Sequence, residues 1–207
     1  MSFQVWMAFM LACWVISVSP GAGAIASMSS GLNYGFRRGY WNAIGLQLAL
    51  LVQIGIVAAG VGVLFATTPW AFLLVKWFGV GYLLYLAYLQ WKAPVQSIKI
   101  EQEQQATKSI PKLVGYGFLV NMSNPKAIVF LLAVLPQFLD LSKPQWIQYV
   151  MMAVTMISID LIVMAGYTGL AAKVLKLLKS PKQQKYMNRT FAVLFSCAAG
   201  LLSLVHQ

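Results

Sequence analysis

The sequence has few charged residues. Charged side chains make up only 9% of its 207 residues, with four acidic residues against fifteen basic ones. Soluble domains are about 25% charged, so this composition excludes a soluble globular domain. Because the chain is also rich in apolar residues, it is not a disordered tail.

Cysteine and histidine are equally scarce. The two cysteines, Cys13 and Cys197, lie far apart in apolar stretches, and His206 is the single histidine. This spacing fits neither a metal site nor a disulfide scaffold, so we expect no metal and no cofactor. No basic patch with interleaved aromatic residues indicates nucleic-acid binding.

Apolar residues are abundant instead, at 60% of the chain, with a mean hydropathy of +0.74. A helix needs about 20 apolar residues to cross a bilayer, so the chain has room for about six or seven spans. Helices are expected because lipid cannot satisfy an open backbone. The sequence predicts an all-α integral membrane protein with six transmembrane helices, near Phe3–Ser27, Trp41–Phe65, Trp70–Trp91, Leu113–Phe138, Trp146–Ala172 and Met187–Val205. No Lys or Arg precedes the first segment, so we interpret it as a retained span and not a signal peptide.

Basic residues are distributed unevenly between the loops. The loops after the first, third and fifth spans contain twelve of them, and the opposite loops contain Lys143 alone. Because basic loops stay in the cytoplasm, both termini are predicted to lie outside, on the periplasmic side. The basic side also favours anionic membrane lipid as a partner. The twelve are Arg37, Arg38, Lys92, Lys99, Lys108, Lys112, Lys173, Lys176, Lys179, Lys182, Lys185 and Arg189.

The two halves of the chain resemble each other weakly. Ser19-Pro20 in the first span is matched by Asn124-Pro125 in the fourth, 105 residues later, and the same offset carries Trp41 onto Trp146. Three spans per half is an odd number, so the second half starts from the opposite side of the membrane. This pattern predicts a 3+3 inverted repeat, with halves at 1–92 and 113–207 joined by a cytoplasmic linker at 93–112.

The paired prolines predict that helices one and four are broken in mid-membrane. Pro removes a backbone hydrogen bond and favours the first helical position, while Ser and Asn are good N-caps. Two half-helix N-termini would then present free N–H groups to one central cavity, which suits a carboxylate. The alternative is a pair of ordinary proline kinks without a ligand. The predicted substrate-binding residues are Ser19, Pro20, Gly21, Gly23, Asn121, Asn124 and Pro125.

Asp160 is the only acidic residue within a span, and such a residue is costly in lipid. It is our candidate for carrying a coupling proton or for binding a substrate ammonium. Lys126, which follows Pro125, is its expected partner and the second candidate for the coupling site. A purely structural ion pair between the two residues is the alternative. Gln47 and Gln53 are candidates for lining a cavity or for bonding between helices. Lys76 is a secondary site candidate that also has the reach to snorkel to the outer surface.

The motifs together resemble those of the bacterial lysine-exporter superfamily, and most of all its homoserine, homoserine-lactone and threonine exporters. Many members have a second proline after Pro-Gly, whereas Ala22-Gly23 follows here, which fits the homoserine-lactone branch better than the lysine branch. The resemblance implies export of amino acids across the bacterial inner membrane in exchange for protons. No ATP-binding motif is present, so an ion gradient would drive it. The matching stretches are Ser19-Pro20-Gly21-Ala22-Gly23-Ala24, Gly31-Leu32-Asn33-Tyr34-Gly35, Lys76-Trp77-Phe78-Gly79, Asn124-Pro125-Lys126-Ala127-Ile128 and Leu135-Pro136-Gln137-Phe138, with Asp160.

Other functions fit the residues less well. A metal-cation exporter needs several converging carboxylates or thiolates, and one intramembrane acid with two distant cysteines does not supply them. An embedded enzyme needs a nucleophile or metal constellation, which the sequence does not contain. A scaffold gains little from the cost of Asp160 and Lys126. We therefore predict a transporter of amino-acid-like solutes, not an enzyme, and leave its oligomeric state open.

Overall fold

The computed structural model is helical throughout the residues it describes, which are 1–67, 71–93, 108–140, 142–171, 173 and 180–203. No strand occurs in these ranges, so the all-α prediction is confirmed for them. The elements are α1 (Phe3–Val18), α2 (Ala22–Gly39), α3 (Trp41–Thr67), α4 (Ala71–Lys92), α5 (Ile110–Met122), α6 (Pro125–Val134), the 3-10 helix η1 (Leu135–Phe138), α7 (Gln145–Gly169) and α9 (Pro181–Ser203).

Two helix pairs are bent at the positions where the sequence predicts breaks. The axes of α1 and α2 differ by 55°, and those of α5 and the α6–η1 segment differ by 56°. The first break holds Pro20, which has no N–H to continue the ladder. The second lies at Asn124, directly before Pro125. The predicted helix breaks at Pro20 and Pro125 are therefore confirmed, while the assignment of each bent pair to one membrane span stays a prediction.

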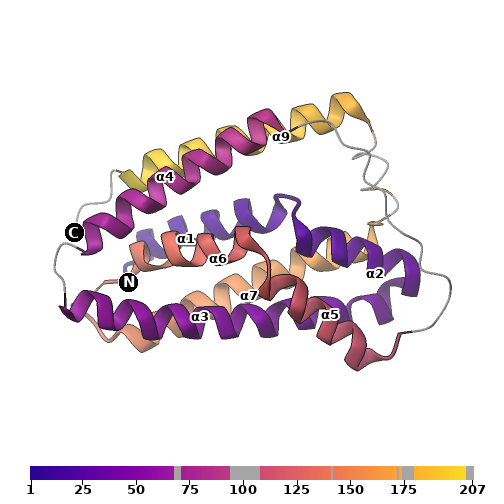
Figure 1. Ribbon diagram of the computed structural model, residues 1–207, viewed down its shortest axis with the longest axis horizontal. Helices are drawn as coiled ribbons and strands as arrows, with labels where there is room; N and C mark the ends of the chain where they lie inside the picture. Colours follow the sequence, from indigo (N-terminus) through magenta and orange to yellow (C-terminus); the bar gives the residue numbers. More distant parts are fainter. Residues whose placement is uncertain (68–70, 94–107, 141, 172, 174–179, 204–207) are drawn as a thin grey trace.

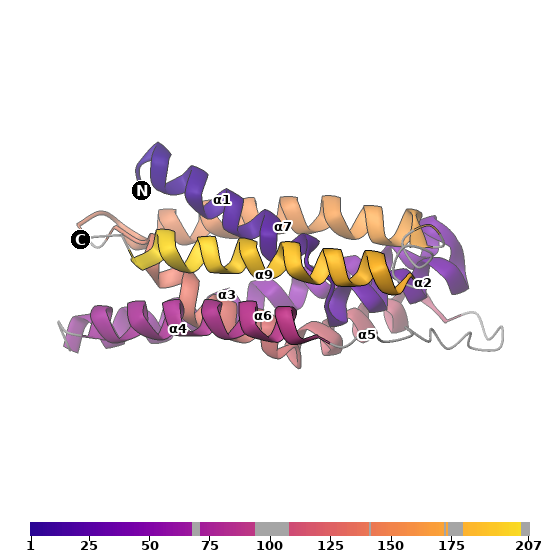
Figure 2. The ribbon, with the colours of Figure 1, turned by 90° about the horizontal axis from the view of Figure 1, so that it is seen from above.

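The helices lie roughly along one long axis, and when each bent pair, α1–α2 and α5–α6, is taken as one unit, successive units alternate in direction (Figures 1 and 2). α1 begins and α9 ends at the same end of the bundle, while α2 ends and α5 begins at the other (Figure 1). There the guanidinium of Arg38 donates to the carbonyl oxygen of Lys108 from Nε and a terminal nitrogen, at 3.1 and 2.9 Å. The two halves thus start at opposite ends, as an inverted repeat requires.

The number of membrane spans is only partly tested. α3 and α7 are long and apolar enough to cross a membrane, and each bent pair qualifies as one broken span, which makes up to four in the described residues. α4 and α9 would complete the six. That number, the inverted repeat and the boundaries at 1–92 and 113–207 stay predictions, and residues 94–107 of the expected linker lie outside the described residues.

Apolar side chains fill most of the inside of the bundle and also cover its outer surface, and a set of uncharged polar side chains is buried among them. This pattern is expected in lipid, where buried amides bond between helices and the apolar surface needs no cover. Buried polar residues include Ser17, Ser27, Asn42, Gln47, Gln53, Asn121, Gln137, Gln148 and Thr168. Large exposed apolar residues include Leu51, Ile56, Leu73, Leu74, Trp77, Phe78, Tyr85, Val150, Val154 and Ile162.

Helices α3 and α5 approach each other closely through glycines. A Cβ atom on Gly45 of α3 would lie 2.0 Å from the carbonyl oxygen of Val114, and one on Gly117 of α5 would lie 2.1 Å from that of Asn42. Side-chain amides join the same two helices, because Asn121 Nδ2 donates to the carbonyl of Leu46 at 2.9 Å. The seam between α3 and α5 therefore fixes Asn121 beside the second break.

Candidate functional site

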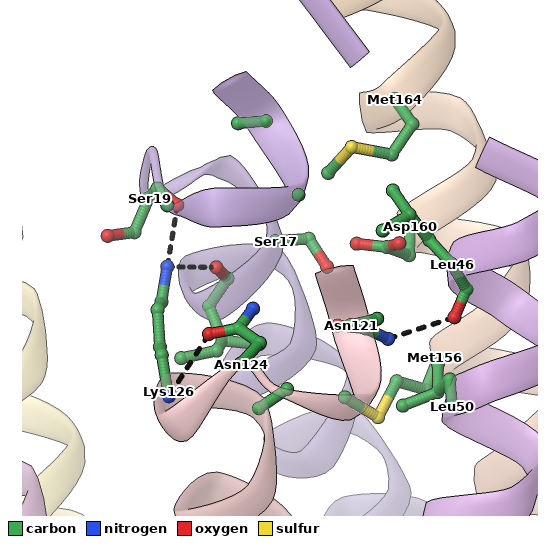
Figure 3. Close-up of a pocket in the computed structure, with 15 residues that line it drawn as sticks. Ser17, Ser19, Leu46, Leu50, Asn121, Asn124, Lys126, Met156, Asp160 and Met164 are labelled. Atoms are coloured by element: carbon green, nitrogen blue, oxygen red, sulfur yellow. Dashed lines mark hydrogen bonds between the residues drawn. The ribbon is translucent and has the colours of Figure 1, made fainter. Parts of the chain in front are cut away.

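A cavity of about 60 Å³ lies where the two breaks meet (Figure 3). A single water needs roughly 10–15 Å³ by the same measure, so the cavity has room for a few waters or for the polar part of a small solute. Helices α1, α2, α3, α5, α6 and α7 and the two breaks contribute to its wall. The lining residues are Ile16, Ser17, Ser19, Gly21, Gly23, Ala24, Leu46, Leu50, Asn121, Asn124, Lys126, Ala127, Met156, Asp160 and Met164.

The structure brings together most of the residues that the sequence singled out. Ser19, Gly21, Gly23, Asn121 and Asn124 line this cavity, and so do Lys126 and Asp160.

The remaining candidates do not line the cavity. Pro20 and Pro125 lie at the breaks without being part of its wall. Gln53 bonds between helices, because its Nε2 donates to the carbonyl oxygen of Asn121 at 2.9 Å. Lys76 belongs to α4, and its side chain lies outside the described part of the chain.

The first break differs from the prediction in its capping. Ser19 does not cap the start of α2. It ends α1, donating its N–H to the carbonyl of Val15 at 3.1 Å, while its Oγ accepts from Gln90 Nε2 of α4 at 3.1 Å. The chain stays extended through Gly21, whose φ and ψ are −150° and −166°, and α2 begins at Ala22 with no side-chain cap. The N–H groups at the start of α2 therefore have no side-chain acceptor from their own N-cap residue.

The second break follows the prediction closely. Asn124 is the N-cap of α6, and its side-chain oxygen accepts from the backbone N–H of Lys126 at 3.1 Å. Pro125 occupies the first turn, where its missing N–H leaves no bond unmade. This N-terminus is thus already capped by its own chain, in contrast with that of α2.

Lys126 reaches from α6 across to the end of α1. Its Nζ donates to the carbonyl oxygens of Ile16 and Ser19, at 2.9 and 2.6 Å. The last carbonyls of a helix have no partner within the helix and carry the negative end of its dipole. Tyr167 of α7 donates to a third of them, on Val18, at 2.6 Å. Side chains from α6 and α7 therefore stabilise the broken end of α1 inside the bundle.

Asp160 lies on α7 on another wall of the cavity, and its Oδ2 accepts from Gln47 Nε2 of α3 at 2.6 Å. The side chain of Ser17 lines the same cavity. The ion pair with Lys126 that we considered from the sequence is not formed between these two described residues, because the lysine bonds to α1 instead. The cavity therefore has a basic group and an acidic group on separate walls (Figure 3).

Several lining residues were missed by the sequence analysis. Met156 and Met164 lie four residues before and after Asp160 on α7, so they share its face. That helical spacing was available as a signal once Asp160 had been chosen. Ser17 gave no signal of its own, because serines in apolar helices commonly bond to their own backbone.

Metal-binding groups do not gather anywhere in the described ranges: no three His, Cys, Asp or Glu side chains lie together there. Cys13 is buried in the core and Cys197 is exposed on α9.

A helical membrane protein with two broken helices around a cavity that holds two charged side chains has the architecture of a secondary transporter. Comparison with known proteins agrees, because residues 14–205 match the LysE type translocator family. The chain belongs to this family of translocators.

Similar proteins from other bacteria support the same class, that of membrane translocators. A homoserine/homoserine lactone efflux protein of Salmonella typhimurium is 39% identical over 203 residues, which cover 98% of each chain. An uncharacterized membrane protein of Vibrio cholerae is 38% identical over 205 residues and 98% of each chain. A leucine efflux protein of an Enterobacter species is 26% identical over 201 residues, covering 96% of this chain and 94% of the relative. No solved structure matches the chain.

Proposed function

We infer that this protein exports homoserine, homoserine lactone and threonine-like amino acids across the bacterial inner membrane in exchange for protons. The observation that carries the proposal is the cavity at the two breaks, which has an ammonium on one wall and a carboxyl group on another. An amino acid has the complementary pair of charges. The names of the relatives point to the same class of solute.

In this proposal Asp160 holds either the substrate ammonium or a proton. Burial favours its neutral acid, whereas a bound cation favours its carboxylate. Alternate occupancy by the two cations would link solute export to proton entry. The half-helix N-termini beside the cavity would hold the substrate carboxylate, and the breaks would let either side open in turn.

The direct test is efflux from proteoliposomes loaded with single solutes under an imposed pH gradient. A panel of homoserine, homoserine lactone, threonine, leucine and lysine covers the named relatives and the wider superfamily. We expect homoserine, its lactone and threonine to leave faster than from protein-free vesicles, and the gradient to accelerate them. If none of the five moves faster than in protein-free vesicles, the proposed function is wrong.

The same proposal makes a prediction about orientation, because the basic end of the bundle should face the cytoplasm. In a Cys197→Ser background, which leaves only the buried Cys13, we expect Lys182→Cys to resist an impermeant thiol reagent added to intact cells. The exposed Lys143→Cys, from the opposite loops, serves as the matched control and should be labelled. Labelling of position 182 from outside would reverse the assignment.

A further inference from the structure

We propose that Lys126 Nζ and the N-terminus of α2 together form a subsite for a substrate carboxylate, and that this subsite distinguishes free amino acids from lactones. The inference rests on the proposed function and deepens it. It assigns a role in substrate selectivity to Lys126, whose ammonium group donates to two backbone carbonyl oxygens in the described structure.

The first step concerns the unused donor of Lys126. An ammonium group has three N–H donors. Two of them bond to the carbonyl oxygens of Ile16 and Ser19, and no further acceptor for this group occurs among the described residues. The side chain lines the cavity. A third donor in a low-dielectric site is costly when it stays unsatisfied, so an anion in the cavity gains a strong bond there.

The second step concerns the start of α2, which lies beside this ammonium. A Cβ atom on Gly21 would be 3.5 Å from Lys126 Cδ and 3.7 Å from its Nζ, so only the missing side chain keeps the space open. Gly23 and Ala24 of the first turn line the same cavity. Gly21 gives α2 no side-chain cap, whereas Asn124 caps α6. The start of α2 and the lysine can therefore share one carboxylate.

The third step concerns selectivity. Asp160 lies on another wall, where it accepts from Gln47, and would take the substrate amine. Homoserine would bind both walls, with its carboxylate at Lys126 and its ammonium group at Asp160. Homoserine lactone keeps the amine, but its carboxyl group is closed into an ester without charge, so it would use the acidic wall alone. Loss of the basic wall should therefore weaken export of the acid and spare the lactone.

The rival interpretation is that Lys126 only caps the end of α1. A purely structural cap affects every solute alike, because its loss changes the break itself. The ratio of homoserine efflux to lactone efflux in one variant therefore separates the two interpretations, whatever the absolute rate of that variant.

The experiment measures initial efflux of L-homoserine and of L-homoserine lactone from proteoliposomes containing the full chain. Lys126→Met keeps the length of the side chain and removes its donors. We expect homoserine export at subsaturating concentration to fall about tenfold or more, as for lost bonds to charged groups, while lactone export changes less than about threefold. Lys126→Arg keeps a charged donor and should restore part of the homoserine rate.

A second variant keeps the test valid if Lys126→Met fails to fold. Gly21→Ala leaves every Lys126 bond in place, and its new methyl group would meet the lysine at ordinary contact distance, so it fills the proposed subsite without a clash. We expect a loss of several-fold for homoserine and little change for the lactone. Gly55→Ala is the matched control, because its Cβ would meet nothing within 4 Å.

Three results would overturn the inference. Equal losses for both solutes in Lys126→Met would identify the lysine as a structural cap only. Unchanged homoserine export in Gly21→Ala would exclude a carboxylate at the start of α2. In both cases export by the unmodified protein still supports the proposed function. If the unmodified protein moves neither solute, the proposed function fails and the subsite with it.

Discussion

Replacing Asp160 by asparagine is expected to abolish export driven by a pH gradient while the protein stays folded in the membrane. Asparagine keeps the size of the side chain and an oxygen that accepts from Gln47, whose Nε2 lies 2.6 Å from Asp160 Oδ2. Fold stability should therefore change little. Since the lysine bonds to α1 and not to Asp160, the variant leaves no broken ion pair behind.

The expected loss is large because one group serves both cations. Removing one partner of a buried charged pair costs about 2–5 kcal/mol, and at 1.4 kcal/mol per factor of ten substrate binding weakens at least about 30-fold. Proton coupling disappears altogether, because an amide does not titrate in this range. Efflux of homoserine from proteoliposomes, with and without an imposed pH gradient, measures both effects.

The matched control is Asp140→Asn, the same chemical change in the loop before α7. Asp140 is bonded by the side chains of Ser142 and Lys143, which lower its pKa to about 2, and it lies away from the cavity wall. Homoserine export by the Asp140→Asn variant should stay close to that of the unmodified protein. If Asp160→Asn retained the normal rate and pH dependence, Asp160 would not be the coupling residue.

Exchange of external for internal homoserine, measured without a pH gradient, separates the two roles of Asp160. If the residue only carries the proton, Asp160→Asn should still exchange solute for solute. If it also binds the amine, exchange should fail as well. Our proposal expects both reactions to fail.

The breaks could be predicted from the sequence because they follow from local chemistry. Pro125 at the start of α6 and Asn124 as its cap depend on residues that adjoin each other in the chain. The burial of amide side chains such as Gln47 and Asn121 is similarly local, since it follows from their place within apolar segments.

The partners of the polar groups could not be predicted, because they lie far away in the sequence. Ser19 reads as a helix cap beside Pro20, yet its hydroxyl accepts from Gln90, and its carbonyl accepts from Lys126. Opposite charges within spans suggest an ion pair between Lys126 and Asp160. The carbonyls at the end of α1 compete for the lysine, and they give no signal in the sequence because every helix end has them.

The second large effect is expected at the seam between α3 and α5, where Gly45→Ala should destabilise the protein strongly. Its Cβ would lie 2.0 Å from the carbonyl oxygen of Val114 and 2.8 Å from the backbone nitrogen of Phe118. Both atoms are main chain, so no side-chain rotation relieves the overlap and the two helices must separate. Separation would also strain the bond from Asn121 to Leu46, which holds one wall of the cavity.

Gly55→Ala on the same helix is the matched control for this prediction, because its Cβ has open space. Alanine in place of glycine favours a helix by about 1 kcal/mol, so Gly55→Ala should leave the melting temperature unchanged or raise it. Overpacking costs about 1–3 kcal/mol or more, and about 2–4 °C per kcal/mol predicts that Gly45→Ala melts about 2–12 °C below Gly55→Ala. Thermal unfolding of the purified protein in detergent measures the difference. Equal melting temperatures would mean that α3 and α5 separate without cost, and that the position of Asn121 does not depend on their contact.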